Sequence, residues 1–156
     1  MAKKKVKPWL RIKPDPVYNS VIITKFINRL MKDGKKTTAM KVFYDAMGII
    51  EEKMGMNPLD VFNKAIENVK PKLEVRTRRI GGANYQIPVE VRPERRLSLA
   101  IRWIITSAQE KKGKPMAQRL AEELMAAYRN EGAAVKIKQN VHRMAEANRA
   151  FAHFKW

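Results

Sequence analysis

The sequence predicts a mainly α-helical single domain from which one two-stranded β-hairpin protrudes, and three observations carry this prediction. Amphipathic helical patterns recur along most of the 156 residues, with apolar side chains spaced to share one helix face. The stretch at about residues 73–91 instead alternates with a period of two around Gly81-Gly82, which is typical of a hairpin. No linker or internal repeat divides the chain, so about six helices and the hairpin are expected to share one core.

Residues 1–19 are predicted to be a basic extended arm that precedes a helical domain of residues 20–156. Prolines at 8, 14 and 16 rule out a regular helix in the arm. Trp9 and Tyr18 are interleaved with its charges, so Trp9 either stacks on bases or folds back on the core. The cations of the arm are Lys3, Lys4, Lys5, Lys7, Arg11 and Lys13.

The helix boundaries follow from caps, glycines and prolines. Ser20 is a suitable N-cap for the first helix, and Asn57-Pro58 provides a cap and a first-turn proline for the third. The predicted helices cover about residues 21–31, 37–52, 57–70, 93–110, 116–128 and 133–149. Val141, Met144 and Ala145 are expected to face the core, and the aromatic end from Phe151 to Trp156 is expected to be irregular.

The hairpin has helical patterns on both sides and therefore no other strand to pair with. A two-stranded ribbon is only marginally stable alone in water. Pro88 suits it, because proline is tolerated on an edge strand. With its arginines on one face, the ribbon is poor core material, and we expect it to project and contact an anionic partner.

Charge is the anomaly of the composition. The chain has 33 Lys+Arg and 15 Asp+Glu, and 33 − 15 gives +18. Solubility needs a net charge of only about 2–8 in a small domain, so the surplus predicts a polyanionic partner, with nucleic acid as the leading candidate. The chain has no cysteine, no secretory signal and no apolar stretch of membrane-spanning length, so we expect a cytoplasmic or organelle-matrix protein without a membrane partner.

The sequence offers little that resembles an active site. His142 and His153 lack the spacing of a zinc pair. Glu122 and Glu123 are neighbours on a predicted helix, so they point in different directions and are expected to lie on a solvated face. Glycine-rich phosphate loops are also missing. We therefore expect no catalysis, no metal, no cofactor and no small-molecule substrate.

Basic clusters remain as the candidate functional residues: the arm, the turn at Lys35-Lys36, the hairpin, Arg95-Arg96 with Arg102, the Lys111–Lys114 loop and the last helix. Arginine binds phosphate through two hydrogen bonds and lysine acts as a point charge. Composition does not separate RNA from DNA. A DNA-compacting protein that uses the ribbon as an arm and an RNA-modifying enzyme therefore stay open as alternatives.

Longer strings of residues resemble the family of bacterial small-subunit ribosomal protein seven over essentially the whole chain. The strings are Pro14-Asp15-Pro16-Val17-Tyr18, Asp33-Gly34-Lys35-Lys36, Glu67-Asn68-Val69-Lys70-Pro71, the hairpin from Gly81 to Arg96, and Arg143 to His153. The resemblance implies a helical fold with a protruding ribbon. It also implies a structural, non-enzymatic component of the small ribosomal subunit.

Several partners are implied by the same resemblance. The family binds the three-prime domain of small-subunit ribosomal RNA, nucleates head assembly and lies near the decoding centre. Its ribbon faces exit-site transfer RNA, so the tip, Gly81, Gly82, Ala83 and Asn84, is expected next to that RNA. Small-subunit proteins nine and eleven are the expected protein partners. The predicted ribosomal-RNA contacts are Lys3, Lys4, Lys5, Lys7, Arg11, Lys35, Lys36, Arg76, Arg78, Arg79, Arg92, Arg95, Arg96, Arg102 and Lys114.

Overall fold

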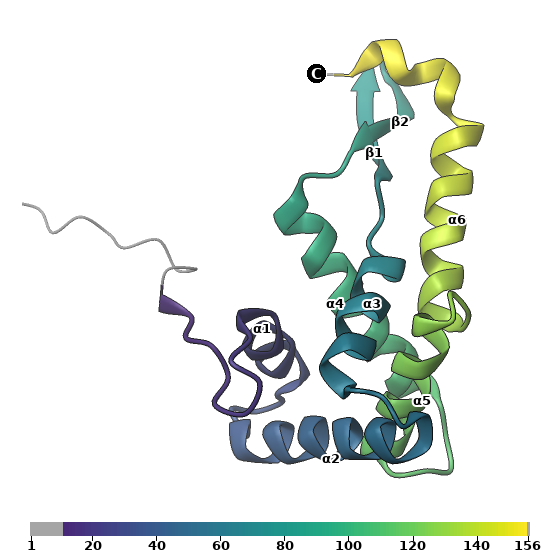
Figure 1. Cartoon of the computed structure of the whole chain (residues 1–156). Helices are drawn as coiled ribbons and strands as arrows, with labels where there is room; N and C mark the ends of the chain where they lie inside the picture. Colours follow the sequence, from purple (N-terminus) through teal and green to yellow (C-terminus); the bar gives the residue numbers. More distant parts are fainter. Residues whose placement is uncertain (1–10, 156) are drawn as a thin grey trace, which may run out of the picture.

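The computed structural model describes residues 11–155, and it confirms a mainly α-helical fold with one two-stranded hairpin. Figure 1 shows a helical body at one end, the hairpin at the other, and the last long helix running between them. The elements are α1 (Val21–Leu30), α2 (Lys36–Met54), α3 (Pro58–Val69), β1 (Leu73–Ile80), β2 (Ala83–Glu90), α4 (Pro93–Glu110), α5 (Met116–Tyr128), α6 (Ala133–Ala147) and the 3-10 helix η2 (Arg149–Phe154).

The core of the body forms where the apolar faces of α1, α2 and α3 meet. Phe26, Phe43 and Phe62 are fully buried, and their ring centroids lie 5.4 to 5.5 Å apart. Tilted and edge-to-face arrangements of this kind favour aromatic pairs beyond the burial of their area. α4 and α5 complete the core, with Trp103 buried as a core residue rather than exposed as a ligand-binding one.

The segment before α1 is attached to the body through Asp15, which is 4% exposed. Its carboxylate accepts hydrogen bonds from the backbone N–H groups of Val17, Tyr18 and Ser20, at 3.1, 2.8 and 2.7 Å. It also accepts one from the Tyr44 hydroxyl on α2, at 3.1 Å. Burial and this bond raise the pKa of Tyr44 to about 12. Asp15 therefore fixes where the N-terminal segment leaves the helical body.

The hairpin has the tip that the glycine pair predicts. β1 and β2 pair antiparallel from Leu73↔Glu90 to Ile80↔Ala83, which leaves Gly81 and Gly82 as a two-residue turn. Their φ angles of 58° and 83° are those that a tight hairpin turn requires and that glycine adopts without steric cost. Within the described residues, the sheet contains these two strands and no other.

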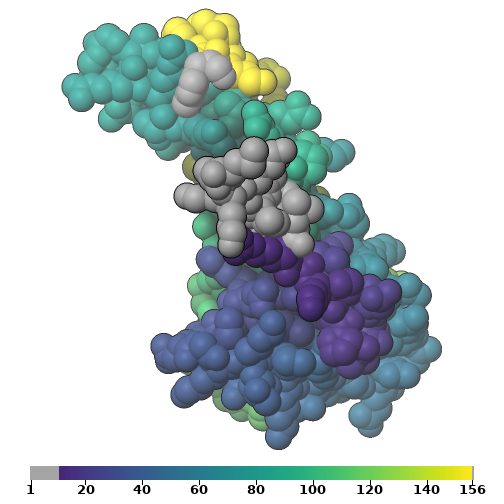
Figure 2. All heavy atoms as spheres, turned by 90° about the vertical axis from the view of Figure 1, so that its left-hand side faces the viewer, coloured from purple at the N-terminus to yellow at the C-terminus, as the bar shows by residue number. Residues whose placement is uncertain are grey.

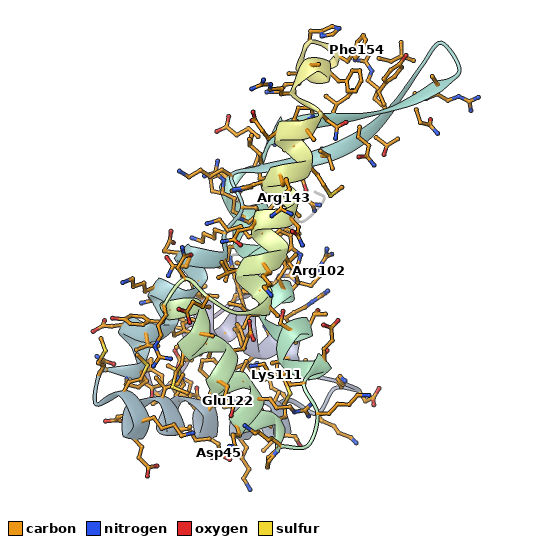
Figure 3. All side chains as sticks on the ribbon, turned by 90° about the vertical axis from the view of Figure 1, so that its right-hand side faces the viewer. Asp45, Arg102, Lys111, Glu122, Arg143 and Phe154 are labelled. Atoms are coloured by element: carbon orange, nitrogen blue, oxygen red, sulfur yellow. The ribbon has the colours of Figure 1, made fainter. Side chains whose placement is uncertain are left out.

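The hairpin is nevertheless supported along one face by the C-terminal part of the chain. Tyr85 on β2 packs against Phe151 and Phe154 of η2, with ring centroids 5.3 and 5.2 Å away. Ile87 on the same face is fully buried. Nearer the body, His142 Nε2 on α6 accepts a hydrogen bond from the Lys72 backbone N–H at 2.9 Å. The free end of the ribbon extends beyond η2 (Figure 3).

Three expectations for the C-terminal half were wrong. The aromatic end is a regular 3-10 helix rather than irregular, because its rings pack on the ribbon. Met144 is 44% exposed, whereas the neighbouring Ala145 is buried. Glu123 is not on a solvated face but is completely buried, where its Oε1 accepts a hydrogen bond from the Ala134 N–H at 2.9 Å.

Candidate nucleic-acid interface

A groove of about 890 Å³ lies between α1 and the first turns of α4. Ile12 closes it on the side of the N-terminal segment, and apolar side chains of α4 line part of its floor. We name it the α1–α4 groove. Five cations line it: Lys25, Arg29, Arg92, Arg95 and Arg102.

The groove forms because the hairpin returns the chain to α1. Pro93 occupies the first turn of α4, where a proline does not interrupt the helix. Polar and apolar side chains of the first α4 turns line the groove together, while Ala100 lies in the core. Glu94 is the one carboxylate among the groove-lining residues. The electrostatic potential in the groove is therefore positive, and a phosphodiester chain is the complementary ligand.

Arg95 is oriented by the ribbon. Its Nε lies 2.8 and 3.1 Å from the two carboxylate oxygens of Glu74 on β1. Arg76 Nε lies 3.3 Å from the same carboxylate. The hydrogen bond to Glu74 is the main cause that raises the pKa of Arg95. Glu74 thus joins an arginine of the ribbon to an arginine of the groove.

Arg96 was predicted to act with Arg95, but it points elsewhere. Its Nε donates to the Val91 carbonyl at 2.7 Å, and its Nη2 lies 3.4 Å from Glu90 at the end of β2. Arg96 is not among the residues that line the groove. Consecutive residues of a helix point in different directions, so one arginine reaches β1 and the next reaches β2. Together, Arg95 and Arg96 fix the base of the ribbon to α4.

The arginines of the ribbon do not share one face, which corrects the expectation from the sequence. Arg76 and Arg78 lie opposite Ile87 and Tyr85, on the face that η2 covers in part. Arg79 pairs with Asn84 on the other, exposed face. An arginine at every second position would have stayed on one side, but Arg78 and Arg79 are adjacent.

Arg78 lies near the tip of the ribbon and also forms a hydrogen bond that supports the fold. Its Nη1 donates to the carbonyl of Phe154. This bond attaches η2 to the ribbon next to the packing of Tyr85 on Phe151 and Phe154. The four tip residues beyond it, Gly81, Gly82, Ala83 and Asn84, are all exposed.

Lys35 and Lys36 start α2 beside two smaller hollows on the other sides of α1. Lys36 lines one together with Arg11 and Lys13, and Lys35 lines the other together with Lys32 and Arg119. No side chain caps the N-terminus of α2, so its free backbone N–H groups add to the positive potential. The predicted residues Arg11, Lys35 and Lys36 therefore flank α1, as the groove does.

Lys114 is not part of this surface. It follows α4 in the Lys111–Lys114 loop and its Nζ lies 2.6 Å from Glu122. Lys111 and Glu122 lie in the body, at the end away from Phe154 and the ribbon (Figure 3). The four predicted arm contacts Lys3, Lys4, Lys5 and Lys7 lie outside the described residues.

Two groove cations, Lys25 and Arg29, were missed by sequence reasoning. They are four residues apart on α1, so they lie on one side of that helix. This spacing was visible in the sequence. Isolated charges on the polar side of an amphipathic helix are common, however, and only the return of α4 gives these two a shared groove with Arg92 and Arg102.

This combination of a helical body, an arginine-lined groove and a projecting ribbon with arginines is typical of the class of proteins that bind nucleic acids. Within residues 11–155 no group of three or more His, Cys, Asp or Glu side chains is placed to hold a metal ion. None of the helices in that range has both the length and the apolar character to cross a membrane. Figure 2 shows the face on which α1 and the ribbon lie one above the other.

Comparison with known proteins gives the particular family. The model of the family described as "Ribosomal protein S7p/S5e" matches residues 2–149. Proteins named "Small ribosomal subunit protein uS7" are similar to this chain in Thermotoga neapolitana, with 62% identity over 94% of both chains, and in Fervidobacterium nodosum, with 55% identity over 100% of both. The protein of the same name in Caldanaerobacter subterraneus is 56% identical over 100% of both chains. The chain belongs to the ribosomal protein S7p/S5e family.

Proposed function

We propose that this chain, a structural and non-catalytic component of the small ribosomal subunit, is a primary binder of the three-prime domain of the subunit's RNA and nucleates assembly of its head. In this proposal the protein works in the cytoplasm at the subunit interface, near the decoding centre. The observation that carries it is the α1–α4 groove, where five cations line one hollow.

The charges of the groove support the proposal because most of them remain available. Among residues 11–155, Lys25, Arg29, Arg92 and Arg102 form no ion pair with a carboxylate. Arg95 is held by Glu74 through Nε alone, and its side chain stays about half exposed. An arginine fork binds a phosphate through two parallel hydrogen bonds, so the groove fits a folded RNA backbone at several points.

A second set of cations lies around α1 and in the arm. Arg11, Lys35 and Lys36 extend the positive surface from the groove toward the start of α2. The lysines at residues 3, 4, 5 and 7 continue it toward the N-terminus in sequence. We assign the residue 1–19 arm a looser electrostatic role, because lysine acts as a point charge rather than as a shaped fork.

The ribbon is the element that we assign to exit-site transfer RNA. Its tip is exposed, and the glycine pair lets backbone approach a partner closely. Arg79 lies on the exposed face next to this tip. Small-subunit proteins nine and eleven complete the proposed set of neighbours, an assignment that rests on the family resemblance.

The test compares binding to a three-prime-domain RNA fragment with binding to duplex DNA of equal length over a series of salt concentrations. Selective binding to the RNA is expected. Equal binding would favour the DNA-compacting alternative. Replacing Arg29, Arg92 and Arg102 with Gln should lower the slope of log K against log[salt] by about 0.9 for each phosphate that the variant no longer neutralises.

The matched control removes the same charge elsewhere. Lys53 and Arg129 are exposed at the ends of α2 and α5, and Lys64 is exposed in the middle of α3, all three outside the groove. Their triple replacement with Gln should change affinity and slope less than the groove variant does. Equal effects of the two variants would mean that total charge, and not the groove, determines binding.

A further inference from the structure

A carboxylate is buried beside the basic surface, at the junction of the ribbon and α4. Glu74, the second residue of β1, is 8% exposed, although it belongs to a two-stranded ribbon and its neighbour Leu73 is 39% exposed. It contacts Arg95 of the groove and Arg76 of the ribbon. A buried negative charge next to a proposed polyanion site opposes binding on charge alone, so its presence requires an explanation.

The geometry of the Glu74 contacts explains why a carboxylate can lie beside this site. Both arginines approach Glu74 through Nε, at 2.8 Å for Arg95 and 3.3 Å for Arg76. The two terminal nitrogens of each guanidinium extend beyond Nε, and both side chains remain about half exposed, at 49% and 54%. Because Glu74 contacts the Nε side of each guanidinium, the terminal nitrogens remain able to donate hydrogen bonds to phosphate.

We propose that Glu74 is a positioning residue for RNA binding: it holds Arg95 and Arg76 with their terminal nitrogens facing the phosphodiester backbone. This inference rests on the proposed function. A free arginine must lose rotamer freedom when it binds, whereas an arginine already held in place has lost it in the unbound protein. In this proposal, the affinity gained by holding the two arginines in place is larger than the affinity lost through repulsion between the Glu74 carboxylate and the RNA phosphates. The repulsion is small because the two guanidiniums already offset the carboxylate's charge.

Glu94 provides a contrast within the same groove. It is exposed on the first turn of α4 and forms no ion pair among the described residues. It therefore orients no arginine and only opposes an incoming phosphate. Neutralising each carboxylate should change affinity in opposite directions, although both substitutions change the net charge by the same amount.

The experiment measures the affinity of the full chain for the three-prime-domain RNA fragment and for a non-specific RNA duplex. Glu74→Gln should weaken binding to the fragment about tenfold, as expected if Arg95 and Arg76 are held less firmly and must become ordered on binding, with little change on the duplex. Glu94→Gln should strengthen binding to both RNAs slightly. Thermal unfolding of each variant shows whether the fold is retained.

A double-mutant cycle with Arg95→Gln separates positioning from stability. If Glu74 acts through Arg95, Glu74→Gln loses most of its effect when Arg95 is already replaced. An equal loss of affinity in both backgrounds would show a merely structural role and overturn the proposal, even if Glu74→Gln is less stable. Stronger binding of Glu74→Gln, like that of Glu94→Gln, would overturn it as well.

The results of these experiments distinguish a failure of this inference from a failure of the proposed function. If the unaltered protein binds fragment and duplex equally, the proposed function fails, and the cycle still reports whether Glu74 orients Arg95 on the RNA that is bound. If the fragment is preferred but the cycle shows no coupling, the function stands and the positioning role is refuted.

Discussion

The buried Glu123 carboxylate should act as the N-terminal cap of α6, and its removal should loosen the helix that supports the ribbon. α6 begins after Gly132, which has no side chain to cap the helix. Glu123 on α5 replaces that cap, because its Oε1 accepts from the Ala134 N–H at 2.9 Å. Its Oε2 lies 3.3 Å from Lys111 Nζ, whose side chain is 34% exposed.

The structure sets the size of the effect. Glu123→Ala leaves the buried Ala134 N–H without an acceptor, at a cost of about 1–3 kcal/mol, and it also leaves a cavity. Lys111 can return to water, so the larger penalty of an isolated buried charge does not apply. We expect a loss of about 3 kcal/mol in the free energy of unfolding, or roughly 6–12 °C in Tm for a chain of this size.

Glu123→Gln separates the cap from the ion pair. The amide oxygen can still accept from Ala134, so only the pair with Lys111 is removed. Glu123 is buried but Lys111 is 34% exposed and can return to water, so we expect a loss of about 1 kcal/mol. Urea unfolding followed by circular dichroism measures both variants, with Glu52→Ala, an exposed carboxylate of α2 that forms no ion pair within residues 11–155, as a control that should stay within about 0.5 kcal/mol. Equal destabilisation by Gln and Ala, or a loss below about 1 kcal/mol for Ala, would refute the capping argument.

Three further predictions concern other parts of the fold. Burial and nearby lysine charges lower the pKa of His142 from its ordinary 6.5. As the pH falls, the imidazole is therefore protonated in the unfolded chain before it is protonated in the folded protein. The hydrogen bond that neutral His142 accepts from the Lys72 N–H should contribute fully to the free energy of unfolding above about pH 6.5, and this contribution should be lost as the pH falls further. His142→Gln should remove that part of the pH dependence, measured by urea unfolding. Tyr44→Phe should cost about 1 kcal/mol at pH 7 because its hydrogen bond to Asp15 is removed. It should also reduce the alkaline loss of stability that begins near pH 10, because the pKa of Tyr44 is raised from 10.0 to about 12. Deleting Gly81–Asn84 should cost about 1–3 kcal/mol, because Arg79 and Ile80 must then form the turn at φ angles that favour glycine, but the domain should stay folded since the tip lies outside the core; loss of the cooperative transition on thermal unfolding would contradict the projecting ribbon.

Most helices and the hairpin could be predicted because their signals are local. Ser20 caps α1 through its Oγ, Asn57 caps α3, and the glycine pair forms the tip, as their positions in the sequence indicate. Each of these features depends on side chains within a few residues of one another. Their physics is therefore contained in a short window of sequence.

The wrong expectations share the opposite property. Glu123 is buried because it meets the start of another helix, and Phe154 is ordered because it packs on Tyr85 in the ribbon. The burial of Glu74, which was not predicted from the sequence, has the same cause: cross-strand pairing places Glu74 on the side of β2's apolar residues, while Leu73 is exposed. Periodicity shows that the two faces of a strand differ, but the packing of distant elements decides which face is covered.

The predicted arginines divide into two groups that should contribute differently to binding. Arg76, Arg95 and Arg96 already contact carboxylates, so they are oriented before RNA arrives. Arg92 and Arg102 are exposed and form no ion pair within residues 11–155, so no carboxylate orients them before binding. Both groups release counterions and so contribute to the salt dependence. Only the first group presents a fixed geometry, and a fixed geometry discriminates between RNA shapes because a partner of the wrong shape cannot satisfy it. We therefore expect net charge to account for attraction to any nucleic acid, and the few carboxylates that hold arginines in place to account for selectivity among nucleic acids.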